Sequence, residues 1–77
     1  MSGRVDVQPG MEVVDMGYQH VGEVAEVRHT TFLLHRSVHR DVYVPLEAIR
    51  EVAGNQIVLY IEADQIDHMN WSSPPNH

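Results

Sequence analysis

The stretch that decides the fold is DVYVPLEAIREVAGNQIVLYIE, residues 41–62. It opens with a β-branched run that ends at Pro45, a residue that cannot donate a hydrogen bond to a strand ladder. Leu46, Ile49 and Val52 then follow at intervals of three, which predicts one or two helical turns beginning near Pro45. A turn at residues 53–56 leads into a second apolar, β-branched run, so the stretch predicts a strand, a helical turn and another strand.

Upstream of this stretch, three more strands are predicted over residues 11–15, 20–28 and 30–36. A turn over residues 16–19 joins the first two. The valines of the second strand are three apart, a spacing that fits a helix as well as a strand. Their β-branched side chains favour a strand, and Gly22 predicts a bulge within it.

Downstream, Asp64 is placed to cap a short helix, and Trp71, the only tryptophan, is expected to anchor the C-terminal segment against the barrel. Residues 72–77 hold no core-forming residue, so we predict a single domain over residues 1–71 followed by a flexible tail. The pattern as a whole predicts a mainly β fold. We expect a small antiparallel barrel or curled sheet of five to six strands with a short C-terminal helix.

The composition limits what stabilises this fold. A chain of 77 residues buries only about 60–65% of the surface that its unfolded form exposes, and without cysteine it has no disulfide, so association with another chain is the most available source of further burial. The N-terminal residues lack the apolar core of a signal peptide, and no run is long enough to span a membrane. We therefore expect a cytoplasmic protein without membrane insertion.

Charge is distributed unevenly along the chain. Eleven acids face five bases, all arginine, and the net charge of −6 argues against nucleic acid as a partner. The segment from Arg28 to Arg40 holds three arginines, three histidines and no acid. Its local charge is therefore +3, and the rest of the chain carries −9, which adds to −6. This segregation predicts a basic patch on an acidic body.

Two of the predicted strands are apolar on both faces. Ile57, Leu59 and Ile61 alternate with Val58 and Tyr60, and Leu33 alternates with Phe32 and Leu34. A barrel interior uses only one face of each strand. The other face must be covered, either by the C-terminal helix with Trp71 or by a second copy of the chain.

Residues 10–61 resemble the PRC-barrel domains, a family that includes the cytoplasmic domain of the photosynthetic reaction-centre H subunit and the C-terminal domain of a ribosome maturation factor. The residues that carry the resemblance are turn residues, core valines and a strand-ending proline: Gly10, Met11, Gly22, Val24, Val27, Val44, Pro45, Ile49, Val58 and Trp71. The closing segment resembles short stand-alone bacterial members of unknown function. The resemblance implies a PRC-type β-barrel that acts as a docking or assembly module rather than as a catalyst.

The histidines of HRSVHRD, residues 35–41, are predicted to lie across a hairpin turn. A four-residue loop would pair Arg36 with Asp41 and Leu33 with Val44, so His35 and His39 do not share a helical face as a zinc-binding pair requires. No serine has the setting of a nucleophile, and the chain holds no glycine-rich phosphate loop. The sequence therefore predicts neither a catalytic site nor a metal or cofactor site.

These observations predict a non-enzymatic protein-association module whose first partner is itself, as a dimer, ring or filament. One alternative is a docking domain for a larger ribosomal or membrane-bound machine. Another is a metal or ligand binder that uses the histidines His20, His29, His35, His39, His68 and His77. The residues expected at the interface are the apolar Phe32, Leu34, Tyr43, Val58, Tyr60 and Trp71 and the basic Arg28, Arg36 and Arg40.

Overall fold

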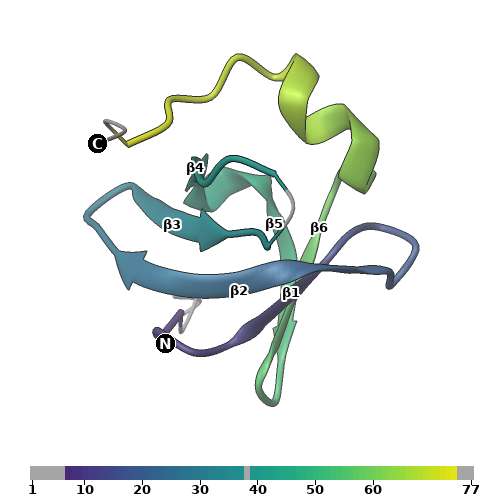
Figure 1. The fold of residues 1–77 in the computed structure, drawn as a ribbon. Helices are drawn as coiled ribbons and strands as arrows, with labels where there is room; N and C mark the ends of the chain where they lie inside the picture. The colour runs from purple at the N-terminus through teal and green to yellow at the C-terminus, as the bar shows by residue number, and fades with distance from the viewer. Residues whose placement is uncertain (1–6, 38, 75–77) are drawn as a thin grey trace.

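The computed structural model describes residues 7–37 and 39–74. They form a mainly β fold, as the sequence predicts, with one six-stranded sheet and two short 3₁₀ segments (Figure 1). The strands are β1 (Glu12–Val14), β2 (His20–Val27), β3 (Thr31–His35), β4 (Val42–Pro45), β5 (Ile49–Ala53) and β6 (Gln56–Leu59). The 3₁₀ segments are η1 (Leu46–Ala48), between β4 and β5, and η2 (Ala63–His68), after β6.

The sheet is curled into a half-barrel, with strand order β4-β3-β2-β1-β6-β5 (Figure 1). All neighbouring strands are antiparallel except β1 and β6, which run parallel with Val13 beside Ile57. The predicted barrel was purely antiparallel, and the parallel pair corrects it. A parallel pair needs a long crossover, and here β2 to β5 all lie between its two strands in the sequence.

The predicted helical turns after Pro45 are only partly formed. A single 3₁₀ turn, η1, gives way to strand β5 at Ile49. The pairing of β5 with β6 shifts register between Ile49 and Glu51, which leaves Arg50 as an extra residue in the strand. A bulge of this kind lets apolar residues three apart face the same side, so the spacing that indicated a helix belongs to a bulged strand.

The C-terminal helix is also shorter than predicted. Residues 63–68 form the 3₁₀ segment η2, and Asp64 does not cap it. Instead, Asp15 Oδ2 accepts a hydrogen bond from the Ala63 N–H at 3.0 Å, and Gln65 Oε1 accepts one from the Glu62 N–H at 3.2 Å. Asp15 comes from the β1–β2 turn, so a residue distant in sequence performs the capping. No helix within the described part of the chain is long and apolar enough to cross a membrane.

The β3–β4 hairpin differs from the prediction by one residue in register. Leu33 pairs with Tyr43, and Phe32 pairs with Val44, whereas the predicted register paired Leu33 with Val44. A slip of one residue moves every side chain to the opposite face. Phe32 and Leu34 therefore point into the core rather than outward, and both are fully buried.

The core lies on the concave face of the sheet. It combines residues of several strands with Ile66 of η2, and Trp71 packs against it. Val14 and Val58 are also buried, but on the opposite face, outside this cluster. On that face His20 Nδ1 lies 3.1 Å from Glu12 Oε2, and Gln56 Nε2 donates to Glu12 Oε1 at 3.3 Å. Strand β6, which lies between β1 and β5, is thus buried on both faces within one chain.

The segment after Trp71 begins against the sheet. The Tyr43 N–H of edge strand β4 donates to the Ser72 carbonyl at 2.8 Å. The predicted anchoring role of Trp71 agrees with its packing against the core. Residues 75–77 of the predicted tail, including His77, lie outside the described residues.

Candidate functional site

The residues predicted to form an interface separate into buried and exposed groups. Phe32, Leu34 and Val58 are fully buried and belong to the interior, so the expected role of these three as outward contacts is wrong. The physical reason is the hairpin register for the first two and, for Val58, the position of β6 between β1 and β5. Tyr43 and Trp71 are half-buried, and Tyr60 is exposed.

Arg36 is not part of an exposed basic patch. Its side chain is 3% exposed, and its Nη2 donates to Asp67 Oδ1 of η2 at 3.1 Å. Its Nε and Nη2 also donate to the Arg40 carbonyl. The Arg36 guanidinium does not form the predicted ion pair with Asp41. Instead, the backbone N–H of Arg36 donates a hydrogen bond to Asp41 Oδ1 at 3.3 Å. Arg36 therefore ties the β3–β4 connection to η2.

Arg28 and Arg40 are exposed, as predicted. The Arg28 guanidinium lies 4.9 Å from the centroid of the Tyr43 ring, within the range of a cation–π contact. Arg28 Nε is also 3.4 Å from Glu26 Oε2, but both side chains are about half exposed, so this ion pair contributes little. Arg28 lies just before β3, where its N–H donates to the Thr31 carbonyl. Arg40 lies beyond the end of β3, where its carbonyl accepts from Arg36. We call Arg28, Tyr43 and Arg40, which span the β3–β4 hairpin, the basic surface.

The histidines lie beside carboxylates. His20 pairs with Glu12 at 3.1 Å, His35 with Asp41 at 3.1 Å, and His39 Nδ1 lies 3.9 Å from Asp67 Oδ2. An open cavity of 340 Å³ is lined in part by His20, His39, His68, Asp64 and Asp67. Within residues 7–37 and 39–74, however, no three His, Asp or Glu side chains are grouped to hold a metal ion.

A group of exposed apolar side chains lies at the end of the molecule formed by the β1–β2 turn and the chain after β6. Tyr60 is 59% exposed, Tyr18 is 56% exposed and Met16 is 44% exposed. The Met16 N–H donates to the Ile61 carbonyl at 3.0 Å, which fixes the turn beside the residue that follows Tyr60. We call Met16, Tyr18 and Tyr60 the tip surface.

Tyr18 has an unusual backbone conformation. Its φ of 66° lies in the left-handed region, which side chains other than glycine, asparagine and aspartate rarely adopt. The Tyr18 N–H donates to the Asp15 carbonyl at 2.9 Å, which closes the turn. A large aromatic residue is held in a strained turn with its ring in solvent, an arrangement that is common at binding sites.

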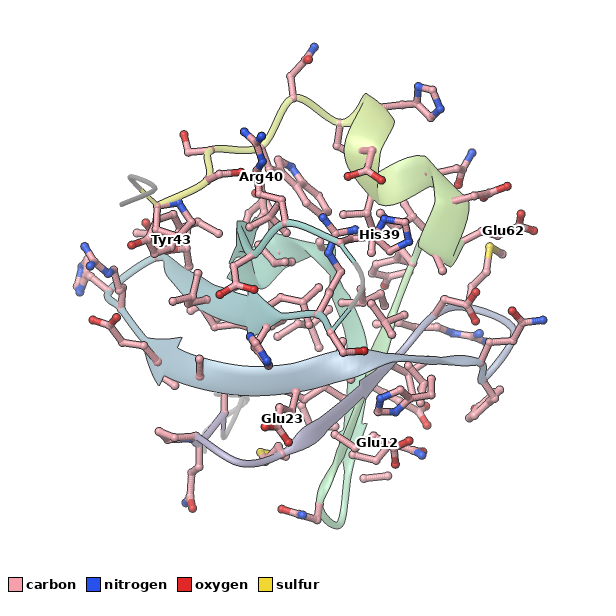
Figure 2. The ribbon with its side chains drawn as sticks, viewed as in Figure 1. Glu12, Glu23, His39, Arg40, Tyr43 and Glu62 are labelled. Atoms are coloured by element: carbon pink, nitrogen blue, oxygen red, sulfur yellow. The ribbon has the colours of Figure 1, made fainter. Side chains whose placement is uncertain are left out.

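The surroundings of the tip surface are acidic. Glu62 and Asp64 are exposed, and with Asp15 they line an open cavity of 380 Å³ beside Gly17 and Gln19 (Figure 2 labels Glu62). Asp15 itself is buried, and its Oδ1 accepts hydrogen bonds from the N–H groups of Gly17 and Gln19, both at 2.9 Å. Burial raises the pKa of Asp15, but these backbone hydrogen bonds outweigh burial and lower it overall.

The sequence did not single out Met16, Tyr18 or Asp15 as functional residues. The turn over residues 16–19 was predicted correctly, and two large apolar side chains within a turn were a signal of exposed apolar surface. Asp15 gave no such signal, because its partner Ala63 lies 48 positions away in the sequence.

Comparison with known proteins gives one match. A family model described as "Uncharacterized protein conserved in bacteria (DUF2171)" matches residues 7–67. No PRC-barrel family model matches, so the resemblance to PRC-barrel domains was wrong. The residues that carried it were turn glycines, core valines and a strand-ending proline, which small curled sheets share for structural reasons. No curated protein and no solved structure matches the chain.

Proposed function

The chain belongs to DUF2171, a family of uncharacterized proteins conserved in bacteria, and we propose from its surface that it is a non-enzymatic protein-association domain whose partner is a second copy of itself. The observation that carries this proposal is the tip surface, where Met16, Tyr18 and Tyr60 expose large apolar side chains and the Met16 N–H holds the turn to the Ile61 carbonyl. Tyrosine, with tryptophan and arginine, is enriched among the residues that supply most of the binding energy at protein interfaces.

The size of the chain supports the same proposal. A domain of 77 residues buries a smaller share of the surface of its unfolded chain than a larger protein does, so it gains more stability from an association interface. Association through the tip surface would remove from water the apolar side chains that the fold of one chain leaves exposed. The proposed interface does not include Phe32, Leu34, Val58 or Arg36, because these residues are buried within the chain.

A second copy is favoured over a foreign partner because the chain carries its own complement. The tip surface has acidic neighbours, Glu62 and Asp64, whereas the basic surface combines exposed arginines with Tyr43. A partner for the tip surface needs positive charge beside an aromatic ring, and this chain presents both.

Sedimentation equilibrium tests the proposal. Tyr60→Ser removes an exposed ring without touching the core, and we expect it to weaken self-association roughly tenfold or more, as loss of an interface tyrosine does. Met69→Ser is the matched control, because Met69 is 41% exposed but lies outside the tip surface. Equal effects of the two substitutions, or a monomeric wild-type protein at every concentration, would contradict the proposal. A monomer that joins a larger complex in lysate would instead favour a docking role.

A further inference from the structure

Glu62, which neighbours the tip surface, and Tyr43 of the basic surface lie at opposite sides of the molecule (Figure 2). Resting on the self-association proposed above, we infer that the two surfaces bind each other, so that the tip surface of one copy docks on the basic surface of the next. The contact is then head-to-tail rather than two-fold. An assembly of this kind closes into a ring or continues as a filament.

The basic surface is built to receive an aromatic side chain. The Arg28 guanidinium lies over the ring of Tyr43 in the same chain, 4.9 Å from the ring centroid. The Arg28 side chain is still 53% exposed. A planar guanidinium can hold a ring on each face, because both cation–π attraction and stacking act on either side. Leu33, which pairs with Tyr43 across the hairpin, is half-buried on the same face of the sheet and adds apolar area.

The tip surface supplies what this site lacks. Tyr18 and Tyr60 are the most exposed of the large apolar residues described, and either ring can stack on the free face of Arg28. Glu62 and Asp64 beside them are exposed acids that would face Arg28 and Arg40 of the next copy. Opposite charges around an aromatic contact fix its orientation and suppress the alternative pairings.

Charge opposes a contact between two tip surfaces. Figure 2 shows Tyr43 and Glu62 at opposite sides of the molecule, whose longest dimension is 39 Å. Two tip surfaces brought together would place four acids, Glu62 and Asp64 of each copy, around one contact, and like charges at an interface oppose binding. The basic surface offers arginines to these acids, so the unlike pairing is favoured.

Tyr18 offers a clean way to disable one end. Because its φ is 66°, glycine adopts this conformation without strain, and Tyr18→Gly removes the ring while relieving the backbone. The basic surface is disabled by Arg28→Ser with Arg40→Ser, two exposed positions. Arg50→Ser on β5 is the control, since it removes an equally exposed arginine outside the basic surface.

The decisive experiment mixes two variants, each with one disabled end. Variant one carries Tyr18→Gly and Tyr60→Ser, and variant two carries Arg28→Ser and Arg40→Ser. Light scattering should show each variant alone as a monomer, because every head-to-tail contact needs one intact surface of each kind. The equimolar mixture should form a one-to-one dimer and nothing larger, since variant one keeps its basic surface and variant two keeps its tip surface. The Arg50→Ser control should assemble like the wild type, and circular dichroism confirms that each variant is folded.

The outcomes separate this inference from the proposed function. Self-association of the wild type together with a mixture that stays monomeric would overturn the head-to-tail contact and leave self-association standing. Variants that assemble alone as the wild type does would overturn it as well. A wild-type protein that is monomeric throughout would overturn the proposed function itself, and the head-to-tail contact with it.

Discussion

Asp15 shows how a single carboxylate joins two parts of this fold. It accepts hydrogen bonds from the N–H groups of Gly17 and Gln19 in its own turn and from Ala63 at the start of η2. The turn and η2 carry or flank the residues of the tip surface. Asp15 therefore positions that surface without being exposed on it.

We expect Asp15→Asn to lower the free energy of unfolding at pH 7 by roughly 1–3 kcal/mol, because an amide accepts at only one of its two positions. The pKa of Asp15 is lowered from 3.8 in the folded state, so the unfolded state binds the proton more tightly. Its stabilisation is therefore present above about pH 3.8 and is lost as pH falls through the lowered pKa. Urea unfolding at several pH values should show a smaller loss of stability in acid for the variant. The same acid dependence in both proteins would contradict this role.

Gly22 is required by the close approach of β2 and β3. A Cβ at this position would lie 2.1 Å from the His35 carbonyl oxygen, which is backbone and cannot rotate away. Gly22→Ala should therefore destabilise the protein by about 1–3 kcal/mol, the usual cost of an overpacked site. Gly17→Ala is the control, because its Cβ would make only an ordinary contact of 3.5 Å with Asp15 Oδ1. Thermal melts that leave Gly22→Ala as stable as Gly17→Ala would refute the argument.

For single residues, the sequence predicted the place in the fold better than it predicted burial and side-chain contacts. It placed Trp71 as an anchor and residues 16–19 in a turn, both of which the structure shows. It assigned Arg36 to an exposed patch because a charged residue in a hairpin is usually solvated. The burial of Arg36 depends on Asp67, 31 positions later, and local pattern does not contain that contact.

Among the elements, η2 is held to the sheet by a buried arginine. Asp67 is about half exposed, whereas the Arg36 side chain it binds is almost fully buried. The hydrogen bond from Arg36 lowers the pKa of Asp67, with further help from the charges of Arg36 and nearby histidines. Asp67 thus remains ionised in acid further than an isolated aspartate, and the contact is lost only as pH falls through that lowered pKa.

Removing Asp67 should loosen η2. Asp67→Ala leaves the buried guanidinium with one partner fewer, and we expect a loss of about 1–2 kcal/mol in the free energy of unfolding. The exposed Asp64 in the same segment provides the matched control as Asp64→Ala, for which we expect little change. Chemical denaturation of both variants measures the difference. Equal stabilities would show that the Arg36 contact does not stabilise the fold.

The C-terminal segment protects the edge of the sheet at β4. Trp71→Ala should release it, since Trp71 packs against the core and Ser72 accepts the Tyr43 N–H. We expect the Tyr43 amide to exchange with solvent at least about tenfold faster, because local opening of roughly 1.4 kcal/mol lower free energy corresponds to that factor. Hydrogen exchange by NMR gives the rate directly. Unchanged exchange at Tyr43 in Trp71→Ala would mean that Ser72 holds β4 without the tryptophan.

Bulges in β5 and β2 explain why the apolar spacing in these strands resembled that of a helix. Apolar residues three apart were read as helical after Pro45 and as ambiguous in residues 20–28. In β5 and β2 the same spacing accompanies register shifts, at Arg50 and at Ala25. Alternation alone cannot reveal a bulge, because the extra residue is defined by the partner strand. The one-residue error in the β3–β4 register has a different origin, the assumed length of the loop, because this pairing has no register shift.

At the scale of the whole molecule, the fold class could be predicted from the sequence, but the pairing of β1 with β6 could not. Alternating short strands were enough to predict a mainly β curled sheet. The parallel pairing of β1 with β6 was not predictable, because it joins residues 44 positions apart and depends on how the sheet curls. That pairing brings the β1–β2 turn beside Tyr60, so the tip surface is a consequence of topology rather than of any local motif.

The basic segment from Arg28 to Arg40 exposes fewer arginines in the structure than the sequence predicted. Arg36 is neutralised by Asp67 inside the fold, which leaves Arg28 and Arg40 as the exposed arginines of the basic segment. Glu62, beside the tip surface, lies at the other side of the molecule from Tyr43 (Figure 2). If copies associate through the proposed head-to-tail contact, added salt should weaken their association.

Self-association is tested most directly by the mass of the wild-type protein in solution. Light scattering over a range of concentrations, at low and high salt, should give a mass that rises above the 8.8 kDa of one chain as concentration increases. The rise should continue past the mass of a dimer, and high salt should reduce it. A mass of 8.8 kDa at every concentration and salt would contradict the account.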